Sequence, residues 1–318
     1  MSVSLKNQVL HAISHNKNMG ADKHAAKGKG QAYGGNKTGK IYSYSTLNAR
    51  KDVAKNFCNY VKEHYPEVKK ASQLKAEHAQ SWLNYCATQG NCSTDTLKSY
   101  KSQLNGIEKN INSTFHASVN LSEAETPQGQ TKAVRCSPMR ADHLQALKSS
   151  YRPFSTGANA LTLAEACGAR NEEICHIQNR DIHINTDGTA TVHIEDGKGG
   201  RNRDVRVQNS EHVQNLKQLK EHLGANPYQR PCPVQKGSLL NNLERHMKST
   251  YTETGVSIKS YYKNQEFHSI RKMFAQAQYD YCRTNGMSKT DSFKYVTEQL
   301  GHNRTDSDLM NRYIANQW

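Results

Sequence analysis

Apolar residues recur at helical spacing in the first part of the chain. Val53, Phe57 and Val61 lie four residues apart, which is typical of the buried face of a helix. The same spacing predicts further helices over residues 76–86 and 94–107. Helices with one apolar face each can enclose a small core, so this part of the chain is predicted to be a helical domain.

Beyond residue 180 the pattern changes to alternation, which is typical of strands with one buried face. Three short alternating runs begin at Ile182, Ala190 and Val205, and they predict a small antiparallel sheet. Helices are predicted before this sheet, over residues 140–149 and 156–167, and again after it. The predicted fold class is therefore mainly α with a small antiparallel β-sheet, that is, α+β.

Helical spacing dominates the C-terminal region. One helix is predicted with a buried stripe, and a second helical run ends at Leu300, where Gly301 suits the left-handed conformation that closes a helix. A last helix includes Tyr313, five residues from the end. The stripe of the first of these helices is predicted to be Ile270, Phe274, Ala277 and Tyr281.

Composition divides the chain further. Residues 1–44 form a basic arm, which through Lys40 holds seven lysines and one acid and is either a solvated tail or a segment that contacts DNA. The helical domain spans 45–118. Residues 119–137 contain Pro127 and Gly129 and are interpreted as a linker. Residues 138–318 form the second domain.

Net charge narrows the class of partner. The chain has 318 residues, with 43 lysines and arginines against 28 acids, which gives a formal net charge of +15. That balance indicates a polyanion, either nucleic acid or an anionic membrane surface. No apolar run approaches the length of a membrane span and no secretion signal is recognisable, so nucleic acid and a cytoplasmic location are favoured.

The eight cysteines show no C-x-x-C pair and no zinc-ligand spacing with histidines, so no metal site is predicted. In a long chain without an export signal, reduced and mostly buried cysteines are favoured over disulfides.

The candidate chemistry lies near the C-terminus. His268 and Arg271 are three residues apart and so share one face of a helix, His302 follows a helix end, and Tyr313 lies in the last helix. Cations of this kind can hold a phosphodiester while a tyrosine attacks it. Taken one at a time, such residues are more often structural, and only their order and helical placement give them weight.

These residues carry a resemblance. The sequence His268-x-x-Arg271, then Leu300-Gly301-His302, then a tyrosine resembles the C-terminal half of the catalytic domain of tyrosine recombinases, the phage integrase family. Residues 168–174 resemble the first arginine motif of that family, and the glycine-rich turn at 196–203 resembles its lysine hairpin. Residues 92–104 are similar to its SAM-like core-binding domain.

The resemblance implies a role for each matched residue. Arg170 and Arg271 would bind the non-bridging phosphate oxygens, with His302 as a further donor, and Glu173 would be a structural acid. Lys198 would be the acid for the leaving oxygen, His268 the proton acceptor and Tyr313 the nucleophile. Two departures stand out: Asn171 replaces an apolar residue, and His302 and Tyr313 are eleven residues apart, about two more than is usual in the family.

The implied activity is site-specific cleavage and rejoining of double-stranded DNA through a 3′-phosphotyrosine, without metal, nucleotide or other cofactor. It would integrate or excise a mobile element, with four protomers on synapsed DNA and with accessory DNA-bending or directionality proteins. The protein would be nucleoid-associated, of prokaryotic, phage or mobile-element origin. Two alternatives stay open: a type IB topoisomerase-like enzyme that nicks and reseals one duplex, and a DNA-binding relative that has lost catalysis.

Further basic residues are candidates for DNA contact. Those of the helical domain can follow a DNA backbone or simply face solvent, and those of the hairpin lie beside the lysine motif. The candidates are Lys27, Lys29, Lys98, Lys101, Arg201 and Arg203.

Overall fold

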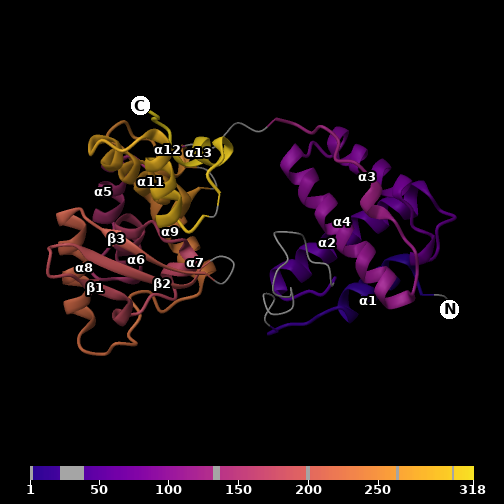
Figure 1. Ribbon diagram of the computed structural model, residues 1–318, viewed down its shortest axis with the longest axis horizontal. Coiled ribbons are helices and arrows are strands. Elements are labelled where there is room, and N and C mark those ends of the chain that lie inside the picture. Colours follow the sequence, from indigo (N-terminus) through magenta and orange to yellow (C-terminus); the bar gives the residue numbers. More distant parts are fainter. Residues whose placement is uncertain (1–2, 22–38, 132–136, 198–200, 263–264, 303) are drawn as a thin grey trace. The chain divides into compact units, whose positions relative to one another are not determined.

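The computed structural model describes residues 3–21, 39–131, 137–197, 201–262, 265–302 and 304–318 (Figure 1). It consists of two compact units, Met1–Ala133 and Val134–Trp318. The first is helical, and the second combines helices with one small sheet, so the predicted fold class is confirmed.

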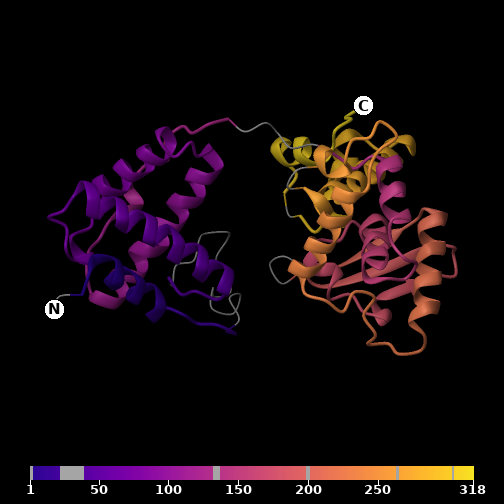
Figure 2. The ribbon, with the colours of Figure 1, turned by 180° about the vertical axis from the view of Figure 1, so that it is seen from behind.

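The first unit is built around the longest helix among its described residues, which contacts the three other α-helices found there (Figure 2). Ser93 begins the longest helix and Ser43 begins one of the others, each by accepting a hydrogen bond from a backbone N–H of the first turn. Leu104, Ile107 and Ile111 of the longest helix are fully buried in the core. The elements are α1 (Leu5–His15), α2 (Tyr44–His64), η2 (Ala71–Gln73), α3 (Ala76–Thr88), α4 (Thr94–Phe115) and η3 (Leu121–Glu123).

This unit is larger than the predicted helical domain. Val9 and Ile13 of α1 are fully buried in its core, so α1 packs in the unit and is not part of a solvated arm. Leu121 and Ala124 are buried in the same core, and the Gln130 backbone N–H donates to the Cys92 carbonyl at 3.0 Å. Much of the predicted linker therefore belongs to this unit. Lys27 and Lys29 lie outside the described residues.

The second unit contains a three-stranded antiparallel sheet in the order β1-β2-β3. Alternate residues of β2 and β3 are buried, because Val192 pairs with Val205 and Ala190 with Val207 on the covered face. Helices α6 and α8 contact β3 and β1, respectively (Figure 1). The strands are β1 (Ile182–Ile184), β2 (Ala190–Gly197) and β3 (Arg201–Val207).

Ten helices of this unit lie within the described residues, and α11 contacts α6, α9, α12 and α13. They are α5 (Ala141–Ser149), α6 (Thr156–Cys167), α7 (Asn171–Ile174), η4 (Asn179–Asp181), α8 (Ser210–Leu223), α9 (Lys236–Ser249), α10 (Ile258–Tyr261), α11 (Glu266–Thr284), α12 (Lys289–Gln299) and α13 (Ser307–Tyr313).

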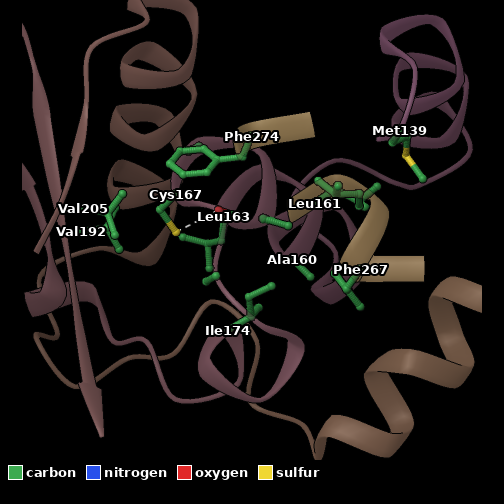
Figure 3. Packing of buried hydrophobic residues seen from close by; sticks show 14 of the residues in the cluster. Met139, Ala160, Leu161, Leu163, Cys167, Ile174, Val192, Val205, Phe267 and Phe274 are labelled. Carbon is green, nitrogen blue, oxygen red and sulfur yellow. Dashed lines mark hydrogen bonds between the residues drawn. The ribbon is translucent and has the colours of Figure 1, made fainter. Parts of the chain in front are cut away.

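The core of this unit forms where the sheet, α6 and α11 meet. Val192 and Val205 point from the sheet towards Leu163 and Cys167 of α6, and Phe274 of α11 packs at the same place (Figure 3). In the described residues no helix is long and apolar enough to cross a membrane.

The predicted stripe of α11 is wrong in its second half. Ile270 and Phe274 are buried as predicted, but Ala277 is exposed and Tyr281 is 45% exposed. The buried positions are instead Ala275, Tyr279 and Cys282. The cause is that α11 is covered on more than one side, so the apolar periodicity alone did not identify its inner face.

The C-terminal segment packs on its own chain. Ile314 is buried in the core, and the Gln276 side chain accepts hydrogen bonds from the backbone N–H groups of Ala315 and Asn316 at 2.9 and 3.0 Å. Arg283 donates to the Trp318 carbonyl at 3.0 Å. These contacts hold the residues after Tyr313 against α11.

Candidate active site

Arg271 lies at the centre of the candidate site, on the first half of α11. Its side chain is almost fully buried, and its two terminal nitrogens donate to the backbone carbonyls of Gly168 and Leu300. Both carbonyls stand at helix C-termini, where acceptors lack intrahelical partners and a cation is favourable. Burial lowers the pKa of Arg271 to about 10, so it keeps its charge at neutral pH.

Gly168 lies in the turn between α6 and α7. This turn leads to Arg170, and its Gly168 carbonyl accepts a hydrogen bond from Arg271. Gly168 ends α6 in the left-handed conformation, with φ +57°, and a Cβ there would meet the Phe274 ring at 2.4 Å. The chain therefore passes directly over Phe274 and then enters α7 at Arg170. A glycine is needed at this position for both reasons.

Tyr313 is the last residue of α13 and points into the same site. Its side chain is buried, with 5% exposed, and its hydroxyl lies 3.1 Å from Nε2 of His302. The His268 ring meets the Tyr313 ring edge-on at 5.4 Å between centroids, and the Arg271 guanidinium lies 5.9 Å from the Tyr313 ring centre. The eleven-residue spacing therefore does not keep Tyr313 from the site.

The turn between α12 and α13 places His302. Gly301 has φ +66°, and the His302 backbone N–H donates to the Thr297 carbonyl at 2.7 Å, as at the end of a helix closed by glycine. Asp306 then begins α13 by accepting from the Leu309 N–H at 3.1 Å. Two local capping arrangements thus bring His302 and Tyr313 together.

His268 is uncharged at neutral pH. The residue is exposed to solvent on one side, but desolvation by the surrounding protein, followed by the positive charges of Lys272, Arg271 and Arg170, lowers its pKa to about 4. A neutral imidazole has one nitrogen that can accept a proton.

Arg170 is held by Glu173 from the first turn of α7. Its Nη1 donates to the Glu173 carboxylate at 2.6 Å, and its backbone N–H donates to the other carboxylate oxygen at 2.8 Å. Arg203, which lies on β3, donates to the same carboxylate. Burial alone would raise the pKa of Glu173, but the hydrogen bonds and charges of Arg203 and Arg170 lower it to about 2.

The structure thus brings five of the six predicted catalytic residues into one cluster: Arg170, His268, Arg271, His302 and Tyr313. Lys198 and the side chain of Arg201 lie outside the described residues. Lys98 and Lys101 lie on α4 of the first unit, where Lys98 is exposed and Lys101 is half-buried.

The prediction that Arg203 contacts DNA does not fit its position, because its side chain is 9% exposed and is paired with Glu173. The alternation along the strand predicts this buried position. Arg203 has the same parity as Val205 and Val207, so period-two alternation places it on the buried face of β3.

The described residues contain no group of three or more His, Cys, Asp or Glu side chains placed to hold a metal ion. The cysteines among them are unpaired thiols, most of them buried.

The chain has the fold of the tyrosine recombinases. The XerH site-specific recombinase bound to palindromic difH substrate is similar, with a TM-score of 0.63 and 14% identity over 98% of this chain and 92% of that one. A lambda integrase dimer bound to a COC′ core site gives a TM-score of 0.59 and 17% identity, over 100% of this chain and 79% of that one.

The Tn1549 transposon integrase in complex with transposon right end DNA gives a TM-score of 0.55 and 13% identity, over 99% of this chain and 96% of that one. No protein-family model matches the sequence, and neither does any curated protein. Identities this low show a shared fold, so the chemistry is argued from the residues.

Proposed function

We propose that the chain is a site-specific DNA recombinase that cleaves and rejoins double-stranded DNA through a 3′-phosphotyrosine. The observation that carries the proposal is the position of Tyr313, whose hydroxyl lies 3.1 Å from His302 beside His268 and Arg271. A phenol surrounded by imidazoles and guanidinium groups is suited to attack on a phosphodiester. The fold shared with DNA-bound recombinases supports the same function.

In the proposed reaction the Tyr313 oxygen forms a bond to phosphorus while the bond from phosphorus to the 5′-oxygen breaks. Arg170 and Arg271 donate to the non-bridging oxygens, where negative charge grows in the transition state. Arg271 Nε is buried without an acceptor among the described residues, and a phosphate oxygen would supply one. The 5′-hydroxyl of another strand then attacks the phosphotyrosine and restores the phosphodiester.

Two histidines are candidates for the proton of Tyr313. His268 remains the proposed acceptor because its neutral imidazole lies edge-on to the tyrosine ring. His302 is the second candidate, because its Nε2 is already within hydrogen-bond distance of the hydroxyl. Lys198 is proposed to protonate the leaving 5′-oxygen, and Glu173 to act as the structural acid that holds Arg170.

The partners follow from the same proposal. A lambda integrase tetramer bound to a Holliday junction is among the similar structures, with a TM-score of 0.56 and 16% identity. We therefore propose a tetramer on synapsed DNA, with Lys27, Lys29, Lys98, Lys101 and Arg201 as contacts to the DNA backbone, in the cytoplasm beside the nucleoid.

The test is covalent trapping. The cellular DNA joined to trapped protein is mapped first, and the mapped site is then made as a duplex with a nick that releases a short fragment after cleavage. Wild-type protein should form a protein–DNA band on a denaturing gel. Tyr313→Phe should bind the same duplex with unchanged affinity and form no such band, because the substitution removes only the attacking oxygen.

Two results would contradict the proposal. A band of equal intensity from Tyr313→Phe would place the nucleophile elsewhere, and no band from wild type would favour a DNA-binding relative without catalysis. A type IB topoisomerase-like enzyme would give the band but would not exchange strands between two differently marked duplexes.

A further inference from the structure

Arg203 occupies an interior position that is unusual for a long charged side chain. Its Nη1 and Nη2 donate to the two carboxylate oxygens of Glu173 at 3.1 and 2.7 Å, and its Nε donates to the backbone carbonyl of Gln299 at 3.0 Å. All three guanidinium nitrogens are therefore engaged. A planar fork of donors is specific to arginine, because the lysine ammonium is a point charge.

The Glu173 carboxylate connects Arg203 to Arg170. The Glu173 carboxylate receives Arg203 on one side and Arg170 on the other, through both the guanidinium and the backbone N–H of Arg170. Glu173 is 5% exposed, so these bonds are shielded from water. The direction in which Arg170 points is thus determined by a carboxylate that Arg203 holds in place.

The Gln299 carbonyl connects Arg203 to the turn that includes His302. Gln299 is the last residue of α12, and Arg203 donates to a carbonyl that the helix leaves without a partner. Gly301 passes so close that a Cβ there would lie 3.1 Å from Cδ and Nη1 of Arg203. His302 follows directly and contacts Tyr313 through Nε2.

We propose that Arg203 is a positioning residue for DNA cleavage, which fixes Arg170 and His302 relative to each other through Glu173 and the Gln299 carbonyl. It acts through these groups and not on DNA. Because it belongs to β3, it also connects them to the strand that begins three residues after Lys198 in the sequence. This inference rests on the proposed recombinase function.

The test compares Arg203→Lys with a matched control, Arg206→Lys. Arg203→Lys keeps a positive charge beside Glu173 but cannot form the two-point pair and the Gln299 bond together. Arg206 lies on the same strand, and its surface pair with Asp187 at 2.7 Å joins side chains that are 53% and 52% exposed. Such a pair contributes little to stability.

Two quantities are measured on the nicked duplex. One is the single-turnover rate of covalent product at saturating protein, and the other is the affinity for the duplex in a Tyr313→Phe background. Arg203→Lys should lose on the order of 10–10² in rate, the size of loss that a misplacement of about 1 Å can cause. Its affinity should stay within about twofold of the parent, as a residue that does not touch DNA requires. Arg206→Lys should keep the wild-type rate.

Each other outcome overturns the inference. A wild-type rate in Arg203→Lys would show that Arg170 and His302 do not depend on it. A loss of affinity in step with the rate would make Arg203 a DNA contact or a general support of the fold. An equal loss of rate in Arg206→Lys would show that the effect is not particular to the contacts of Arg203. If wild type itself forms no covalent product, the proposed function fails and the inference falls with it.

Discussion

At the scale of single residues, the charge of His268 depends on its surroundings, and this has a consequence for stability. In the unfolded chain a histidine has a pKa of about 6.5, whereas partial desolvation and nearby cations lower the pKa of His268 to about 4. As pH falls below about 6.5 the unfolded state binds the proton first, so the folded state loses stability until about pH 4. Above pH 6.5 the group contributes no such difference.

We predict that His268 contributes to the decrease in the free energy of unfolding between pH 6.5 and pH 4, by an amount that its exposure to solvent reduces. His268→Gln should therefore lose less stability than wild type when urea unfolding at pH 7.5 is compared with unfolding at pH 4.5. His183→Gln, at an exposed position of β1, is the control and should behave as wild type does. Parallel pH dependence in wild type and His268→Gln would argue against a lowered pKa of His268 in the folded state.

The resemblance to tyrosine recombinases implied that Arg170, His268, Arg271, His302 and Tyr313 share one site, whereas helical spacing by itself predicted only that His268 and Arg271 lie on one helix face. The sequence did not predict that Arg271 would be almost fully buried with its donors on two backbone carbonyls. That arrangement depends on the packing of α11 against both the next helix, α12, and α6, which lies far away in the chain.

At the scale of elements, the end of α6 is the most constrained turn of the site. Gly168 has φ +57° and lies against Phe274, so Gly168→Ala combines a left-handed backbone with a steric clash. We predict a loss of roughly 2–5 kcal/mol in the free energy of unfolding, the sum of about 1–2 for the backbone and about 1–3 for overpacking. Chemical denaturation measures it.

Gly188→Ala separates the two contributions. Gly188 has φ +80°, but nothing lies within 4 Å of where its Cβ would be. It should lose about 1–2 kcal/mol, from the backbone alone. Equal losses in the two variants would show that the contact between Gly168 and Phe274 adds nothing.

At the scale of the whole molecule, the two-part organisation was visible in the sequence, but the extent of the parts was not. Glycine, proline and small polar residues indicated an arm before residue 45 and a linker after residue 118. In the structure α1 and the segment around Leu121 complete the core of the first unit. A short apolar stretch is buried only when elements distant in the sequence pack against it. Composition does not indicate whether they do.

The excess of positive charge makes a last prediction about binding. With a formal net charge of +15, affinity for duplex DNA should fall steeply with salt, because each lysine that meets a phosphate releases a counterion. Replacing both Lys98 and Lys101 by alanine should make the slope of log K against log salt shallower by about 2. Electrophoretic shifts at several salt concentrations measure this slope.

The control removes the same charge from lysines that already have acidic partners in the first unit. Lys55 pairs with Asp52 at 3.1 Å, and Lys75 pairs with Glu77 at 3.5 Å. Alanine at both positions should change the slope much less if α4 is the surface that follows the DNA backbone, because contact matters more than net charge. An equal change in the two double variants would mean that the field of the whole unit attracts DNA, and Lys98 and Lys101 would then be solvated residues of α4.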